Sequence, residues 1–115
     1  MNDSSWMRNM FSPNSEATPV EMLPGVVRRT LSCGDHMLLC EITLAKGAVV
    51  PEHDHPHEQT GYVVRGRLIF RIADEEREVV AGDGYVIPGN VSHAVTALEE
   101  SIAIDIFSPV REEYL

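Results

Sequence analysis

The sequence predicts an all-β chain whose strands close into one antiparallel barrel or jelly roll. From Pro19 onward, short β-prone runs are broken at regular intervals by Gly, Pro, Asn and Asp, which is typical of many short strands joined by turns. No stretch keeps an apolar period of about 3.6 residues for long enough to form a packed helix. Closing the sheet removes the exposed edges that a small all-β chain must otherwise protect.

The length and the distribution of residue types indicate one domain preceded by an arm. A chain of 115 residues has room for a single hydrophobic core. We expect the barrel to occupy residues 19–115. Residues 1–18 are rich in Ser, Asn and Pro without a period, which predicts a mobile N-terminal arm. Trp6 and Phe11 favour an arm that orders only against another surface.

The expected strands follow from runs of β-branched and aromatic residues between turn residues. Turns are expected at pairs such as Arg65-Gly66 and at clusters such as Pro88-Gly89-Asn90. The strands are expected at residues 26–31, 37–44, 60–64, 68–73, 78–80, 85–87, 93–97 and 101–107.

One short segment concentrates the histidines. Residues 51–59 contain three of the five in the chain, at positions 53, 55 and 57. Residues two apart in an extended chain point to the same side, so His53 and His55 can reach one metal ion from a single strand. His57 has the same parity, but the neighbouring Pro56 leaves its direction open. The alternative is a polar loop with exposed histidines.

Two spaced patterns resemble the two sequence motifs of the cupin family. The first runs from Gly47 over five residues to His53-x-His55, then over three to Gln59 and over six to Gly66. Gln59 stands where that motif usually has Glu. The second runs from Gly82 over five residues to Pro88, with His93 five positions after the proline. Asn90 and Ala97 replace the usual Gly and Asn of that second motif.

The resemblance implies a metal site. By analogy with the family, His53, His55, Gln59 and His93 project into the barrel and bind one divalent ion. These ligand types suit Ni, Mn, Fe or Zn, so the metal is left open. All four ligands would be neutral, which makes the bound ion a stronger Lewis acid with a preference for anionic ligands.

The last expected strand combines apolar residues with a carboxylate. Alternation over residues 101–107 places three isoleucines on one face, which we expect to pack in the core. Ala103, Asp105 and Phe107 lie on the other face, which suggests a cavity containing a charge. A buried aspartate requires a partner, so Asp105 should face Arg111, the metal site or a substrate. An edge strand with Asp105 in solvent is the alternative.

The end of the chain resembles the C-terminal signature of the KdgF-type pectin-degradation cupins. That signature reads Asp-x-Phe-x-Pro-x-Arg, then an acidic pair and an aromatic-Leu end, and residues 105–115 have this pattern. Members of the group open 4,5-unsaturated monouronates, the products of pectate and alginate lyases, to linear 5-keto sugars. The resemblance implies that Asp105 transfers the proton, Phe107 shapes the pocket and Arg111 holds the carboxylate of a small anionic sugar.

Two other function classes stay open at this stage. A small cupin dioxygenase or other oxidoreductase would use the same ligands with a redox metal, and a non-catalytic sugar-binding module would need Arg111 but not a buried proton donor. Because small cupins commonly pair and the arm is apolar, we expect a homodimer.

Composition excludes some partners. The formal net charge of -9 offers no basic surface for nucleic acid. The sequence has neither an apolar run of the roughly 18 residues that a membrane span needs nor a secretory signal, so a cytoplasmic protein without a membrane partner is expected.

Overall fold

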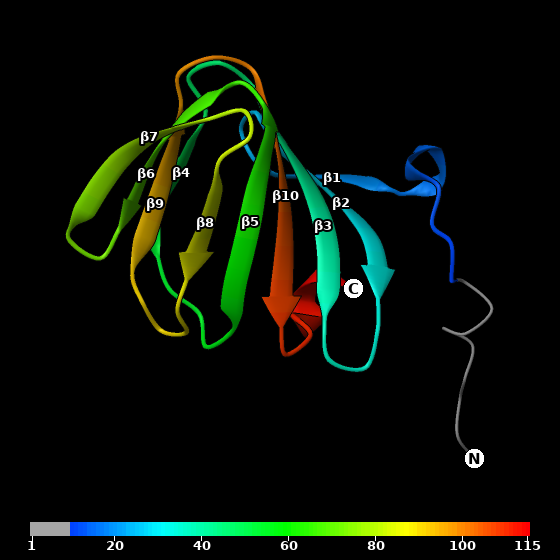
Figure 1. The fold of residues 1–115 in the computed structure, drawn as a ribbon. Coiled ribbons are helices and arrows are strands. Elements are labelled where there is room, and N and C mark those ends of the chain that lie inside the picture. The colour runs from blue at the N-terminus through cyan, green and yellow to red at the C-terminus, as the bar shows by residue number, and fades with distance from the viewer. Residues whose placement is uncertain (1–9) are drawn as a thin grey trace.

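The structure, a computed structural model, describes residues 10–115. Within this range the chain forms two antiparallel sheets that face each other as a jelly roll, which confirms the predicted fold class (Figure 1). The six-stranded sheet has the order β1-β2-β3-β10-β5-β8, and the four-stranded sheet has the order β4-β9-β6-β7. The strands are β1 (Pro19–Leu23), β2 (Val26–Cys33), β3 (Leu38–Leu44), β4 (Val49–His53), β5 (Glu58–Arg65), β6 (Arg67–Ile72), β7 (Glu75–Val80), β8 (Gly84–Ile87), β9 (His93–Ala97) and β10 (Ser101–Ser108).

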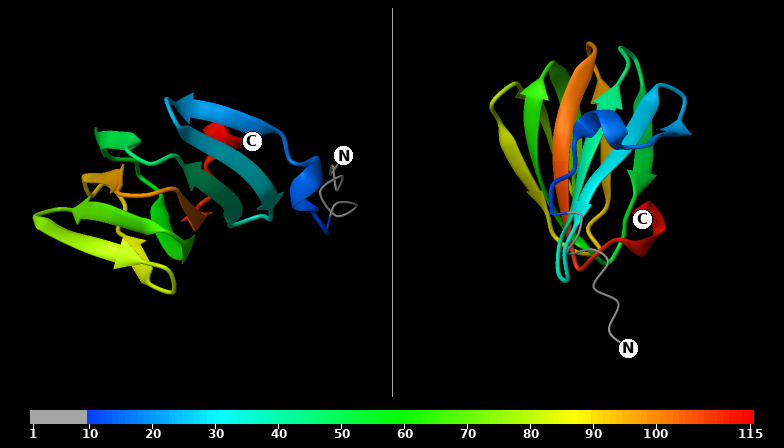
Figure 2. Two further views of the ribbon diagram at one scale, coloured as in Figure 1. Left: turned by 90° about the horizontal axis from the view of Figure 1, so that it is seen from above. Right: turned by 90° about the vertical axis from the view of Figure 1, so that its right-hand side faces the viewer.

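The hydrophobic core lies between the inner faces of the two sheets. In β3, every second residue from Leu38 to Leu44 is buried, as expected for a strand with one face on the core. Leu68 and Phe70 of β6 come from the four-stranded sheet and belong to the same buried cluster. The two views in Figure 2 show the sheets packed against each other with the C-terminus close to β2 and β3.

Strand β10 is central, and its inner face differs from the expectation. It pairs with β3 on one side and β5 on the other, so the predicted alternative of an edge strand is wrong. Ala103, Asp105 and Phe107 are buried toward the barrel interior. The expectation that the isoleucines pack in the core is also wrong, because Ile102, Ile104 and Ile106 are half-buried on the outer face of the sheet. Both faces of this strand are largely apolar, so alternation alone could not distinguish inside from outside.

Two strands were not expected from the sequence, and both contain proline. β1 begins at Pro19 at one edge of the six-stranded sheet, and β4 contains Pro51 at one edge of the four-stranded sheet. Proline lacks the N–H that a central strand needs, but an edge strand tolerates it. The register of β4 against β9 is interrupted between Val50 and His53, which accommodates the proline.

Strand β7 is longer than expected. It begins at Glu75, directly after the Ala73-Asp74 turn, whereas the sequence predicted a strand only from Glu78. Its charged residues are exposed on an edge strand, where charge prevents pairing with other chains. The same charges make the segment look like a turn in the sequence.

The expected N-terminal arm is only partly described. Its residues 1–9, which include Trp6, lie outside the described residues. Residues Asn14–Glu16 form a single 3-10 turn, and Asn14 Nδ2 donates to Glu41 Oε1 of β3 at 3.0 Å. No helix in residues 10–115 is long and apolar enough to cross a membrane.

Candidate metal centre and pocket

Three histidines converge at one end of the barrel interior. His53 ends β4, His55 lies in the loop between β4 and β5, and His93 begins β9. One ring nitrogen from each lies within 4.8 Å of the others. The ring centroids of His53 and His93 are 4.2 Å apart, and those of His55 and His93 are 5.0 Å apart. This spacing allows all three rings to bind one ion.

Backbone carbonyls determine which nitrogen of each ring faces the cluster. The Nδ1 atoms of His53, His55 and His93 lie 2.9, 3.1 and 2.9 Å from the carbonyl oxygens of Pro51, His57 and Val91. A carbonyl only accepts, so each Nδ1 carries the proton and each neutral ring keeps its lone pair on Nε2. Hydrogen bonds of this kind, made by the ring nitrogen that does not face the metal, orient histidine ligands in metal sites.

The inward-facing nitrogens have the state that a metal requires. Burial lowers the pKa of both His55 and His93, and the positive charge of Arg111 lowers it further. Both shifts favour the neutral form of the ring. His93 Nε2 is buried without a hydrogen-bond partner in the described part of the chain. A buried acceptor left without a partner is unfavourable, and a bound cation would supply one.

Gln59 places its side-chain amide oxygen beside the three histidines, as a fourth donor atom. It is buried on the inner face of β5, and its Oε1 lies 3.1 Å from His55 Nε2. Because the proton of His55 is on Nδ1, two lone pairs meet at this contact, an arrangement that a shared cation would relieve. The three histidines could thus hold one divalent ion, in agreement with the metal site that the resemblance implied.

The two histidines of the first motif do not share a strand. The expectation that one strand carries both is wrong, because β4 ends at His53 and His55 is in a loop. The backbone N–H of Asn90 donates to the carbonyl of His55 at 2.7 Å and holds that loop. Asn90 has φ 64°, a conformation that glycine adopts freely and asparagine tolerates. This explains why Asn can replace the usual Gly of the second motif.

The remaining histidines do not join the cluster. His57 follows the loop and its ring centroid lies 5.6 Å from that of His55, but it is not part of the three-histidine group. His36 is exposed in the connection between β2 and β3.

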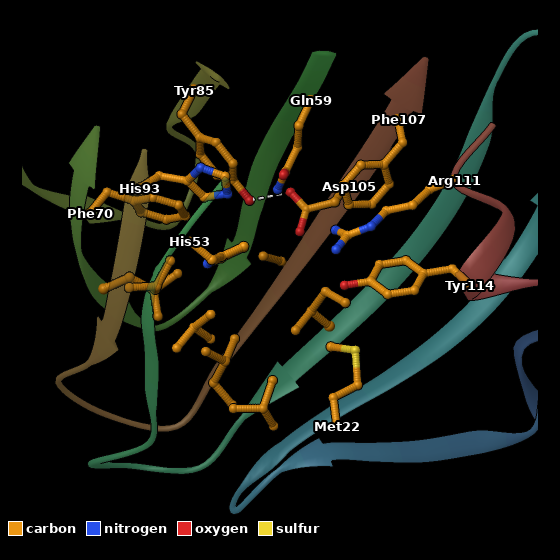
Figure 3. Close-up of a pocket in the computed structure, with 17 residues that line it drawn as sticks. Met22, His53, Gln59, Phe70, Tyr85, His93, Asp105, Phe107, Arg111 and Tyr114 are labelled. Atoms are coloured by element: carbon orange, nitrogen blue, oxygen red, sulfur yellow. Dashed lines mark hydrogen bonds between the residues drawn. The ribbon is translucent and has the colours of Figure 1, made fainter. Parts of the chain in front are cut away.

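Asp105 lies in the same pocket as His53 and His93 (Figure 3). Tyr85 Oη donates to its Oδ1 at 2.6 Å. Burial raises the pKa of Asp105, while hydrogen bonds from Tyr85 and Gln59 and the charge of Arg111 oppose the increase. The pocket is lined mainly by apolar side chains, with polar groups from His53, Gln59, Tyr85, His93, Asp105, Arg111 and Tyr114.

Arg111 reaches the pocket from the segment that follows β10. Its guanidinium lies 4.1 Å from the ring centroid of Tyr114 and 5.2 Å from that of Phe107. Nε donates to Glu113 Oε2 at 3.0 Å, and the other end of the guanidinium points into the pocket (Figure 3). In the described chain its ion pair is therefore with Glu113 and not with Asp105. The two free nitrogens suit a planar carboxylate.

Sequence reasoning missed two tyrosines of the pocket. Tyr85 of β8 touches Asp105 although they are 20 residues apart, and Tyr114 in the 3-10 turn Glu112–Tyr114 stacks on Arg111. The strand register that brings Tyr85 to Asp105 cannot be read from residue spacing. The aromatic residue of the C-terminal signature was a usable signal for Tyr114.

Comparisons with known proteins agree with this geometry. Residues 40–107 match the family described as Cupin domain. The chain is 37% identical over 112 residues to the pectin degradation protein KdgF of Dickeya dadantii, covering 95% of this chain and 100% of the relative. The structure of KdgF from Halomonas sp. matches with a TM-score of 0.87 and 33% identity, covering 93% of this chain and 99% of that one. An RmlC-like cupin from Shewanella frigidimarina matches with a TM-score of 0.89 and 29% identity, covering 93% and 96%.

Proposed function

This chain belongs to the cupin family and is a homologue of KdgF, and we propose that it is a metal-dependent enzyme that opens 4,5-unsaturated monouronates to linear 5-keto sugars. The observation that carries the proposal is the buried carboxylate of Asp105 beside a three-histidine cluster, with the guanidinium of Arg111 in the same pocket. A protein that only binds a sugar has little use for a buried proton carrier.

The proposed reaction is an isomerisation, so it needs no second reactant. The hydroxyl on C1 of the ring loses a proton, the bond between C1 and the ring oxygen breaks, and the resulting enol gains a proton on C4 as the ketone forms at C5. One group that can both accept and donate a proton is sufficient for these transfers. Asp105 is the carboxylate in the pocket placed to do this, and its burial raises its proton affinity.

Arg111 and the cluster would hold the anionic substrate. The free end of the Arg111 guanidinium can bind the substrate carboxylate through two parallel hydrogen bonds. When bound, a divalent ion held by His53, His55, Gln59 and His93 would supply Lewis-acid polarisation of a substrate oxygen. Phe107 packs beside both His55 and Arg111, with its ring centroid 5.7 Å from that of His55. It therefore forms an apolar wall between the two polar ends of the pocket.

The test is to follow the ultraviolet absorbance of an unsaturated galacturonate monomer with the metal-loaded protein. We expect the absorbance to disappear faster than in its spontaneous decay. Asp105→Asn should retain the metal and bind substrate but lower kcat about a hundredfold or more, the usual effect of losing a positioned acid or base. Arg111→Lys should mainly raise KM, because an ammonium cannot form the two parallel contacts.

The outcome separates the candidate functions. A wild-type rate equal to spontaneous decay would rule out the uronate reaction and favour the oxygenase or sugar-binding alternatives. Full activity of Asp105→Asn would be compatible with the proposed substrate but would refute the role of the carboxylate in proton transfer. The exposed His36→Ala variant serves as the control, since that side chain lies in a turn away from the pocket.

A further inference from the structure

A row of three residues runs inward from one edge of the six-stranded sheet, across β8, β5 and β10. Tyr85 of β8 is the register partner of Gly61 of β5, and Gly61 is the register partner of Asp105 of β10. Tyr85 and Asp105 are thus separated by two interstrand spacings, about 10 Å between their backbones. Nevertheless the Tyr85 hydroxyl donates to Asp105 Oδ1 at 2.6 Å. The phenol ring therefore spans the strand between them.

Gly61 makes this contact possible. A Cβ placed at Gly61 would overlap the ring and the hydroxyl of Tyr85, so the ring lies directly over the glycine backbone. Phe70, from the facing sheet, packs on the same ring with centroids 4.2 Å apart. Gly61 and Phe70 contact the ring of Tyr85, and Asp105 accepts a hydrogen bond from its hydroxyl. Together these contacts fix the position of the hydroxyl.

The consequence for Asp105 is a fixed carboxylate. Its Oδ1 is occupied by the hydrogen bond from Tyr85, and the second carboxylate oxygen points into the pocket (Figure 3). A carboxylate held in this way presents one defined oxygen to a ligand instead of rotating between two. The backbone register, the missing side chain at Gly61 and the packing of Phe70 all contribute to this orientation.

We propose that Tyr85 is a positioning residue that orients Asp105 for proton transfer, and that Gly61 is required because it leaves space for the phenol ring. This inference rests on the proposed function of Asp105. Tyr85 acts through the carboxylate, so its contribution should appear in kcat and should vanish when the carboxylate is absent.

The experiment compares Tyr85→Phe, Gly61→Ala and Gly84→Ala with the wild type, each loaded with metal. Tyr85→Phe keeps the ring and removes only the hydroxyl, and we expect kcat to fall about tenfold or more, the scale of losing a hydrogen bond to a charged group. KM should stay within about threefold, because the groups that bind substrate are untouched. Metal content and the midpoint of thermal unfolding are measured for every variant.

Gly61→Ala should reproduce the kinetic loss without removing a polar group. Gly84→Ala is its matched control, because a Cβ at this neighbouring glycine would meet only Gly61 O, at 3.4 Å. We expect Gly84→Ala to retain wild-type kcat. If Gly61→Ala does not fold, Tyr85→Phe carries the test alone, since phenylalanine fills the same space.

A double variant distinguishes positioning from a general structural role. Tyr85→Phe added to Asp105→Asn should lower kcat no further than Asp105→Asn alone. An additional loss in the double variant, a loss of metal from Tyr85→Phe, or full kcat in Tyr85→Phe would each overturn the inference while leaving the proposed function standing. A wild-type protein that does not exceed spontaneous decay would overturn both.

Discussion

Metal binding should raise the thermal stability of this protein through the three histidines and Gln59. The perturbation is removal of metal with a chelator, followed by addition of Ni, Mn, Fe or Zn one at a time. His55 and His93 are only 6% and 3% exposed, and the Nε2 atom of His93 has no hydrogen-bond partner among residues 10–115. The native chain therefore presents a preformed set of donors that an unfolded chain lacks, so metal should bind the native state preferentially.

The expected size of the effect follows from linkage. At a free metal concentration about a hundredfold above the dissociation constant, stabilisation is about 2.7 kcal/mol. For a domain of this size, each kcal/mol shifts the midpoint of thermal unfolding by about 3 to 6 °C, so an increase of about 8 to 16 °C is expected. Differential scanning fluorimetry measures this shift directly, and elemental analysis gives the metal content.

Variants connect the shift to the cluster. His93→Ala and His53→Ala should still fold, because apolar burial between the sheets stabilises the barrel, but the metal-dependent increase should disappear. His36→Ala is the matched control and should keep the full increase. No increase with any of the four metals in the wild type, or an equal increase in His93→Ala, would refute the metal centre. The comparison uses the difference with and without metal, because His93→Ala also loses packing.

Three further predictions concern the cluster, the sheet connection and the assembly. Gln59→Glu should retain metal but lower kcat about tenfold or more, because the new carboxylate adds a negative charge next to Asp105 and makes the bound metal ion a weaker Lewis acid. An unchanged kcat in the absorbance assay would contradict this prediction. Gly66→Ala should lower the free energy of unfolding by about 2 kcal/mol or more in urea titrations. The reason is that Gly66 has φ 99° and an added Cβ would lie 2.6 Å from Glu100 O. A variant as stable as the wild type would refute this prediction. We propose a homodimer formed through the outer face of the six-stranded sheet, where Tyr62 is 51% exposed. Light scattering at micromolar concentration should therefore give twice the chain mass for the wild type, and Tyr62→Glu should give a monomer. A wild-type monomer would exclude this assembly.

Local pattern was sufficient for the fold class, and the resemblance to the cupin motifs supplied the residues of the metal cluster. The alternation in β3 and the turn residues between short strands depend only on neighbouring positions, so the sequence alone indicates an all-β barrel. The resemblance to the cupin motifs implied the ligand set His53, His55, Gln59 and His93, and the three histidines of that set lie close enough together to hold one ion. The prediction that His53 and His55 share a strand was wrong, although both rings still reach the cluster.

Other features depend on contacts between distant strands. The sequence correctly placed Asp105 inside the barrel but placed the isoleucines of β10 in the core, since both faces of that strand are apolar and hydrophobicity could not separate them. Pro51 obscured β4, because a proline is compatible with a strand only when the strand lies at a sheet edge, and edges are defined by the whole sheet.

The sequence by itself determined the strand-rich architecture and, through its resemblance to the cupin motifs, the chemical types of the ligands, because period and motif spacing are properties of the chain. Only the tertiary structure decided that Tyr85 reaches Asp105 across Gly61 and that Arg111 turns its free end into the pocket. The hydrogen bond depends on the register of three strands and on an absent side chain at Gly61. Register is chosen by the packing of the complete barrel, and no local segment contains that information.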